Sequence, residues 1–217
     1  MRSFPVTDEV RSYAVDHGSW RPDEVMRRLR SETAALGEVA GMQIGEDQGQ
    51  LLTMLTRLVG ARRAVEVGTF TGYSSLCIAR GLVDGGSLLC CDVSEEWTAI
   101  GQRAWAEAGL AGRIELRIAP ALETLRSLPE AAEVDLAFID ADKPGYAAYW
   151  AELVPRIRPG GLLLADNVLW SGRIVDPSVD DANTAALRAF NDVVAADDRV
   201  ETVVLTAFDG LTMARKR

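Results

Sequence analysis

Residues 137–143 read Ala-Phe-Ile-Asp-Ala-Asp-Lys, and residues 162–167 read Leu-Leu-Leu-Ala-Asp-Asn. Each stretch is an apolar run that stops abruptly on carboxylate or amide groups, which favours a buried strand of a parallel sheet over a helix. Open α/β sheets bind ligands outside the carboxyl ends of their strands, so we expect Asp140, Asp166 and Asn167 to lie together there. Such an all-oxygen cluster suits a hard cation such as Mg²⁺. The alternative is that both aspartates only cap helices or begin turns.

The rest of the chain alternates between predicted strands and helices. We predict strands at residues 64–67, 87–91, 114–118, 134–139, 161–165, 200–206 and 211–214. We predict helices at residues 72–79, 95–109, 121–127, 146–154 and 183–195. The alternation predicts an α/β fold with a doubly wound, Rossmann-like sheet, mostly parallel with one antiparallel C-terminal strand after an Asp-Gly turn at 209–210. Residues 1–60 form a predicted helical lead-in to the α/β core of residues 61–217, within one domain.

The composition argues against several classes of protein. A formal net charge of −9 over 217 residues opposes a nucleic-acid-binding surface, which needs a basic face. No run of about 18 apolar residues is present, so we expect no membrane span. The opening residues lack an apolar signal core, which predicts a cytoplasmic protein. The cysteines, Cys77, Cys90 and Cys91, lie in apolar segments and are expected to be buried thiols.

A glycine-rich turn, Gly-Thr-Phe-Thr-Gly at residues 68–72, follows the first predicted strand. Glycine at such a turn lets a ligand approach the backbone closely, but the spacing differs from the Gly-x-Gly-x-x-Gly of dinucleotide loops. Glu66 precedes the turn, and Asp92 ends the next strand, where an acid commonly accepts hydrogen bonds from ribose hydroxyls. Both acids suit a nucleoside with a positively charged amino-acid tail, such as S-adenosylmethionine. A structural turn with two exposed acids is the alternative.

Five motifs in order carry a resemblance to a known family. They are Met-Gln-Ile-Gly-Glu-Asp-Gln-Gly-Gln at 42–50, Glu-Val-Gly-Thr-Phe-Thr-Gly-Tyr-Ser at 66–74, Asp92, Asp-Ala-Asp-Lys at 140–143 and Asp-Asn-Val-Leu-Trp at 166–170. From about Met42 to the C-terminus, the chain resembles the small cation-dependent O-methyltransferases. This group contains catechol O-methyltransferase and the caffeoyl-CoA O-methyltransferases. The resemblance implies the methyltransferase form of the Rossmann-like sheet.

The resemblance also implies the residues of the site. The residues implied to contact S-adenosylmethionine, or to hold the loop around it, are Ile44, Glu66, Gly68, Thr69, Ser74, Asp92, Ala121 and Asp140. Among them, Asp92 would bind the ribose and the Ala121 backbone would meet the adenine. The implied ligands of Mg²⁺ or another divalent cation are Asp140, Asp166 and Asn167. Lys143 is the implied catalytic base, which would take a proton from the acceptor hydroxyl.

The implied reaction is methyl transfer from the sulfonium to a phenolic oxygen. The metal would clamp adjacent hydroxyls of a small catechol-like or other vicinal-diol phenol. Pro144-Gly145 and Ser171 depart from the residues usual in plant coenzyme A-ester enzymes, which favours a small acceptor. Trp170 is a candidate wall for the aromatic acceptor, with core packing as the alternative. The family also implies a homodimer.

Two other functions stay open. A NAD-dependent oxidoreductase on a similar sheet is opposed by the glycine spacing, by Glu66 and by the lack of a Tyr-x-x-x-Lys pair. A non-catalytic S-adenosylmethionine-binding protein is opposed by the complete set of predicted metal ligands and Lys143. Binding assays with NAD and S-adenosylmethionine would distinguish the oxidoreductase from the methyltransferase. Methyl transfer to catechols would distinguish the enzyme from a non-catalytic binding protein.

Overall fold

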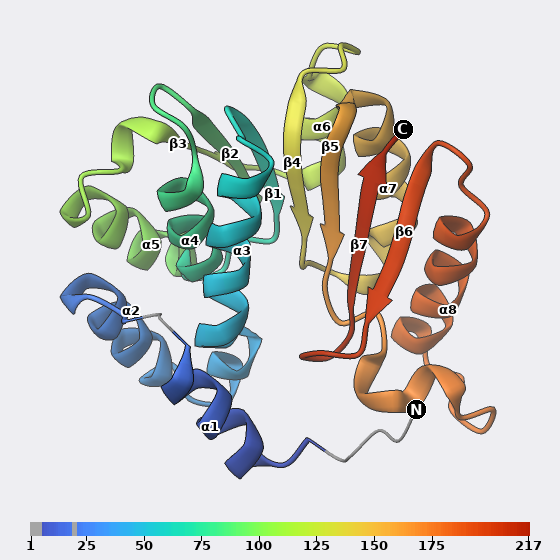
Figure 1. Ribbon diagram of the computed structural model, residues 1–217, viewed down its shortest axis with the longest axis horizontal. Helices are drawn as coiled ribbons and strands as arrows, with labels where there is room; N and C mark the ends of the chain where they lie inside the picture. Colours follow the sequence, from blue (N-terminus) through green and yellow to red (C-terminus); the bar gives the residue numbers. More distant parts are fainter. Residues whose placement is uncertain (1–5, 19–20) are drawn as a thin grey trace.

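The computed structural model describes residues 6–18 and 21–217. These residues form one seven-stranded sheet with helices around it (Figure 1). The strand order is β3-β2-β1-β4-β5-β7-β6. β7 is antiparallel to both neighbours, whereas the other pairs are parallel, so the predicted sheet is confirmed. The strands are β1 Arg63–Val67, β2 Ser87–Asp92, β3 Ile114–Ile118, β4 Val134–Ile139, β5 Ile157–Ala165, β6 Val200–Leu205 and β7 Leu211–Lys216.

Helices precede the sheet, as predicted for the lead-in. They are α1 Asp8–His17, α2 Glu24–Ala34, the 3₁₀ helix η1 Gly37–Met42 and α3 Glu46–Leu58. Asp23 caps α2 by accepting a hydrogen bond from the Met26 amide at 3.0 Å, which satisfies a donor that the first helical turn leaves free. None of the helices in the described part of the chain combines the length and hydropathy needed to cross a bilayer.

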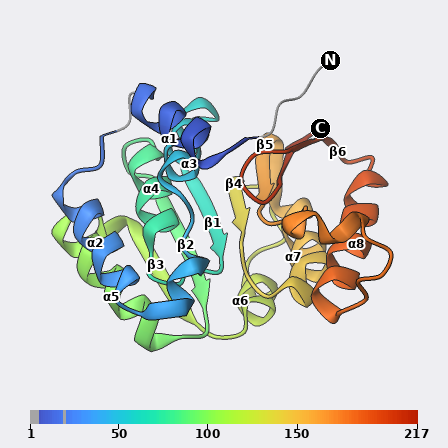
Figure 2. The same cartoon turned by 90° about the horizontal axis from the view of Figure 1, so that it is seen from below.

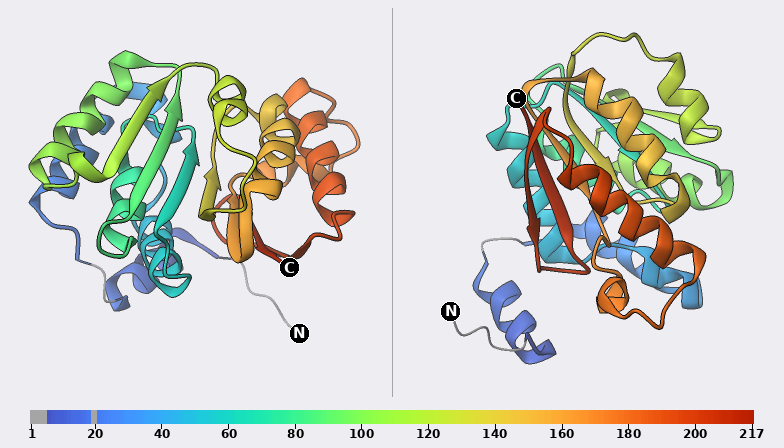
Figure 3. Two further views of the ribbon diagram at one scale, coloured as in Figure 1. Left: turned by 90° about the horizontal axis from the view of Figure 1, so that it is seen from above. Right: turned by 90° about the vertical axis from the view of Figure 1, so that its right-hand side faces the viewer.

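The later helices cover both faces of the sheet (Figures 2 and 3). Together with α3, helices α4 and α5 pack on one face, and α6, α7 and α8 pack on the other. These helices are α4 Tyr73–Gly81, α5 Glu95–Glu107, α6 Ala121–Ser127, α7 Tyr146–Leu153 and α8 Ala182–Ala195. Short 3₁₀ helices connect them: η2 Ala111–Arg113, η3 Lys143–Gly145, η4 Val154–Arg156 and η5 Trp170–Val175.

The strand β4 shows why its sequence is an unbroken apolar run. Leu136 and Phe138 enter the hydrophobic cluster on one face, while Ala137 and Ile139 enter the cluster on the other. All four side chains are completely buried. Successive side chains of a strand point to opposite faces, so a strand covered on both sides must be apolar at every position. Burial of each large side chain contributes about 1.5–3 kcal/mol.

The loop between β6 and β7 is one residue longer than predicted, because β6 ends at Leu205 and not at residue 206. It spans residues 206–210, and the Gly210 amide donates to the Ala207 carbonyl at 2.9 Å. The loop also binds the segment after β5. The Val168 amide donates to the Gly210 carbonyl, and the Leu169 amide donates to the Asp209 carbonyl, both at 3.0 Å. The hairpin therefore supports the chain that follows Asp166.

Candidate active site

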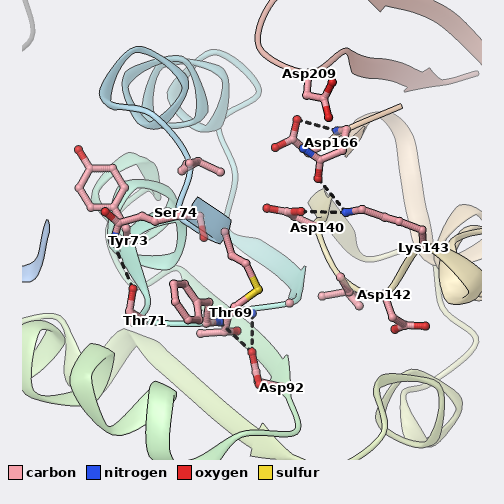
Figure 4. A pocket seen from close by; sticks show the side chains of 18 of the residues that line it. Thr69, Thr71, Tyr73, Ser74, Asp92, Asp140, Asp142, Lys143, Asp166 and Asp209 are labelled. Carbon is pink, nitrogen blue, oxygen red and sulfur yellow. Dashed lines mark hydrogen bonds and ion pairs between the residues drawn. The ribbon is translucent and has the colours of Figure 1, made fainter. Parts of the chain in front are cut away.

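A cavity of about 1160 Å³ lies at the carboxyl ends of the parallel strands (Figure 4). Ten of the eleven residues predicted for the site line it. They are Ile44, Gly68, Thr69, Ser74, Asp92, Ala121, Asp140, Lys143, Asp166 and Asn167. Backbone hydrogen bonds fix two of the carboxylates at this edge. The Asp140 amide donates to the Val67 carbonyl at 2.8 Å, and the Asp166 amide donates to the Ile139 carbonyl at 2.9 Å.

The ammonium group of Lys143 joins the residues of the oxygen cluster. Its Nζ donates to Asn167 Oδ1 at 2.7 Å, to Tyr146 Oη at 2.8 Å and to Asp140 Oδ1 at 3.3 Å. The Tyr146 hydroxyl in turn donates to the Asp166 carbonyl at 3.1 Å. The side chains of Asp140 and Asn167, which are distant in sequence, therefore converge on one cationic group.

Both aspartates of the cluster are unfavourably placed for a negative charge. Burial raises the pKa of Asp140, although the Lys143 charge opposes the shift. Burial, followed by repulsion from Asp140, raises the pKa of Asp166 to about 7. The Gln48 amide lies near Asp166 and acts in the opposite direction, but its Nε2 makes no hydrogen bond of normal geometry with the described residues. A second cation beside Lys143 would stabilise both ionised carboxylates.

The backbone after β5 adopts an unusual conformation around this cluster. Asn167, Trp170 and Ser171 have φ values of 57°, 46° and 52°, in the left-handed region that non-glycine residues rarely adopt. The Ser171 amide donates to Asp209 Oδ1 at 2.5 Å, which helps to hold the segment against the β6–β7 loop. Local strain of this kind is retained where surrounding contacts fix it, commonly at functional sites.

Gly68 is required where β1 meets the end of β4. Its φ is +88°, and a Cβ atom at this position would lie 1.9 Å from the Asp140 carbonyl oxygen. Only glycine fits such a close approach of two backbones. The glycine turn therefore brings the predicted cofactor loop directly against the predicted metal ligand.

Asp92 holds the same turn from the end of β2. Its Oδ2 accepts hydrogen bonds from the Thr69 and Phe70 amides, both at 2.8 Å. Its Oδ1 accepts from the Val93 and Ser94 amides at 2.7 and 2.8 Å. Asp92 thus shapes the cavity wall through the backbone, and its predicted contact with a ribose stays a prediction.

Glu66 is the one predicted residue that does not line the cavity. Its side chain is completely buried, and Oε2 accepts hydrogen bonds from the hydroxyls of Ser75 and Thr69 and from the Cys90 thiol. Its Oε1 has no hydrogen-bond partner among the described residues. Burial raises the pKa of Glu66 to about 7, although the hydrogen bond from Ser75 and weaker ones oppose the shift. The free oxygen leaves Glu66 able to accept one further hydrogen bond.

Several cavity residues were not predicted from the sequence. Phe70 and Trp97 meet edge to face with ring centroids 5.2 Å apart, and they form an apolar wall beside Asp92. Tyr149 donates to Asp142 Oδ1 at 2.5 Å. The sequence could have indicated this wall, because Phe70 lies inside the glycine turn and Trp97 lies in the first turn of the helix after Asp92. Trp170 lines the cavity as predicted, and the Lys143 ammonium lies 5.6 Å from its ring centroid.

The sheet order, the glycine turn and the cavity define a Rossmann-like fold with a small-molecule site at the carboxyl ends of its strands, and comparison with known proteins identifies the family. The profile of a family described as O-methyltransferase matches residues 16–217. A probable caffeoyl-CoA O-methyltransferase of Dictyostelium discoideum is 36% identical over 96% of this chain and 92% of its own. The catechol O-methyltransferase domain-containing protein 1 of Mus musculus is 37% identical over 91% of this chain and 76% of its own.

Solved structures agree with these sequence relatives. An O-methyltransferase from Bacillus cereus in complex with SAH superposes with a TM-score of 0.88 at 30% identity, covering 96% of this chain and 97% of that one. TomG from Streptomyces achromogenes, an O-methyltransferase in complex with SAM, gives the same TM-score and identity, covering 96% of both chains. The chain belongs to the O-methyltransferase family. It is an S-adenosylmethionine-dependent O-methyltransferase, and the NAD-dependent alternative is wrong.

Proposed function

We propose that this enzyme methylates one hydroxyl of a catechol-like or other vicinal-diol phenol and needs a divalent cation to do so. One observation carries the proposal: Lys143 Nζ lies between Asp140 Oδ1 and Asn167 Oδ1, with Asp166 beside them in the same cavity. A base, two carboxylates and an amide at one point are the groups needed to bind and deprotonate adjacent hydroxyls.

The chemistry of the cluster supports a hard cation. Asp140, Asp166 and Asn167 supply only oxygen donors, the type that Mg²⁺ prefers. The described residues contain no metal-type cluster of three His, Cys, Asp or Glu side chains, because the third proposed donor is an amide. Burial raises the pKa of both aspartates despite the charge of Lys143, and a divalent cation beside them would favour their ionised forms. A divalent cation held there would bind adjacent hydroxyls and favour their ionised form.

The walls of the cavity support the proposed contacts with S-adenosylmethionine, which supplies the methyl group. Ile44, Ser74 and the glycine turn would surround its methionine portion, and Glu66 would hold the turn from beneath through its hydrogen bond with Thr69. Asp92 would face the ribose, and Ala121 the adenine, next to the wall of Phe70 and Trp97.

Lys143 would act as the general base. Its Nζ, as the neutral amine, would take the proton of the acceptor hydroxyl, while Tyr146 and Asn167 hold the nitrogen in place. The resulting oxygen forms the bond to the methyl carbon as the carbon–sulfur bond breaks. Because displacement requires the three atoms in line, the rigid strand ends on both sides of the cavity contribute by positioning.

The acceptor is proposed to be small. Trp170 offers an aromatic wall beside Lys143. Pro144-Gly145 departs from the residues usual in plant coenzyme A-ester enzymes, and the sequence shows no long insertion that would build a pocket for such an ester. The homodimer, the cytoplasmic location and the absence of nucleic-acid and membrane partners stay predictions from the sequence.

A methyl-transfer assay tests the proposal. Labelled S-adenosylmethionine is incubated with catechols and with matched monophenols, in Mg²⁺ and in EDTA. We expect transfer to catechols only, with loss of activity in EDTA and recovery when Mg²⁺ is restored. Equal activity in EDTA would refute the metal, and equal activity on monophenols would refute the vicinal diol. No transfer to any phenol would refute the acceptor class.

A further inference from the structure

A buried hydrogen-bond network links the cofactor loop to the helical lead-in. Gln43 Nε2 donates to Thr33 Oγ1 at 2.9 Å and to Thr71 Oγ1 at 3.2 Å. Thr33 Oγ1 lies 2.8 Å from Thr71 Oγ1 and 2.9 Å from the Leu29 carbonyl, so its single proton has two acceptors. Both threonines are buried, with 1% and 0% of their surface exposed. A buried hydroxyl without a partner would be costly, so the three side chains depend on one another.

Each member of the network comes from a different segment of the chain. Thr33 lies in α2, and Thr71 lies in the glycine turn between β1 and α4. Gln43 lies directly after η1, and both Gln43 and Thr71 line the cavity. The network therefore connects residues 41–45 with the glycine turn, the two segments proposed to surround the methionine portion of the cofactor.

The segment that carries Gln43 has few other anchors. From residue 35 to residue 42 no side chain is buried, and Met42 is 48% exposed. Gly37, Gly41 and Gly45 punctuate the segment, and Gly37 has a φ of +77°. Exposed, glycine-rich segments with few apolar contacts have low local stability. Ile44, at 8% exposure, and the side-chain amide of Gln43 are two of its contacts with the protein body.

We infer that Gln43 and Thr71 are positioning residues that hold the segment of residues 41–45 against the glycine turn, so that the cofactor pocket is formed before the cofactor enters. The inference rests on the proposed cofactor contacts of Ile44 and the glycine turn. Without this link, cofactor binding would first have to order the segment. The affinity for the cofactor would then fall in proportion to the fraction of molecules in which the segment is already ordered. Neither residue takes part in the chemistry, so the oxygen cluster should be unaffected.

Calorimetric titration of the full chain with S-adenosylhomocysteine tests the inference. Gln43→Met and Thr71→Val remove the link at similar volume, Thr71→Ser keeps the hydroxyl, and Gln102→Met on the exposed face of α5 is the matched control. We expect Kd to rise about tenfold in Gln43→Met and in Thr71→Val. The double variant should bind no more weakly than about twice either single variant, because both remove one link. Thr71→Ser and Gln102→Met should stay within about twofold of wild type.

The outcomes separate this inference from the proposed function. A lower Tm in Gln43→Met with unchanged Kd for S-adenosylhomocysteine would show a merely structural network and overturn the inference alone. If the rise in Kd of the double variant equalled the product of the two single rises, the residues would make two independent contacts, which would also overturn the inference. An equal loss of Mn²⁺ affinity in Gln43→Met would mean general damage to the site and would also overturn it. A wild-type chain that binds no S-adenosylhomocysteine would overturn the proposed cofactor contacts as well.

Discussion

Lys143 is held by side chains that follow the adjacent strands β4 and β5 or begin helix α7, and it is buried to an extent that is unusual for a lysine. Only 8% of its surface is exposed, and its nitrogen contacts Asp140, Tyr146 and Asn167. Sequence reasoning placed Lys143, Asp140 and Asn167 in one site. The hydrogen bond between Lys143 and Tyr146 was not predicted, because it depends on how the turn η3 folds the chain between these two residues.

Replacement of Lys143 by methionine should lower kcat by about 10²–10⁴-fold, since general bases contribute rate factors of this size. The Kd for S-adenosylhomocysteine should change far less, because the lysine serves the acceptor. Steady-state kinetics and calorimetry measure the two quantities. The other lysine of the chain provides the control, Lys216→Met, which should leave both unchanged. Wild-type turnover in Lys143→Met would remove the lysine from the mechanism.

Glu66 should make the stability of the protein depend on pH. Its pKa is raised from 4.5 to about 7 by burial, so the folded protein retains a proton that the unfolded chain releases between these values. The free energy of unfolding should therefore fall as pH rises from 4.5 to about 7, on the order of 3 kcal/mol. Denaturant titrations of wild type and Glu66→Gln across this range measure the difference. Parallel curves for the two proteins would contradict the expectation.

At the scale of elements, the end of β4 controls the geometry of the glycine turn. Gly68→Ala should destabilise the protein by more than about 3 kcal/mol, because its Cβ would overlap the Asp140 carbonyl. Gly109→Ala is the matched control, since Gly109 also has a positive φ, of +71°, but nothing lies within 4 Å. The control should lose only about 1–2 kcal/mol from backbone strain. Chemical denaturation measures both, and equal losses would show that the close approach is unimportant.

The bounds of a strand that is buried on both faces could be predicted from the sequence. The bounds of strands and loops that depend on contacts with distant segments could not. β4 follows from its apolar run alone. β5 was predicted to begin at residue 161, but it begins at Ile157 and includes Pro159 and Gly160. Such residues normally indicate a turn, and here an irregular register against β4 accommodates them. The β6–β7 loop differed for a related reason, because its backbone bonds to a distant segment.

For the whole molecule, strand ends brought together by the sheet order account for the site. β1, β4 and β5 are adjacent, so Asp140 and Asp166 must end at the same edge. This could be predicted from the sequence, because alternating strands and helices imply a parallel sheet. The network of Gln43 could not, because it depends on how α2 and η1 pack beside the glycine turn, and no local pattern encodes that packing.

Binding of Mn²⁺ measured by electron paramagnetic resonance most directly tests whether the oxygen cluster is a metal site. We expect one Mn²⁺ per wild-type chain and at least about tenfold weaker binding in Asp166→Ala, which removes a buried carboxylate proposed as a ligand. Asp84→Ala, which changes an exposed aspartate, should bind Mn²⁺ like wild type. Failure of the wild-type protein to bind Mn²⁺, or full binding by Asp166→Ala, would contradict the account.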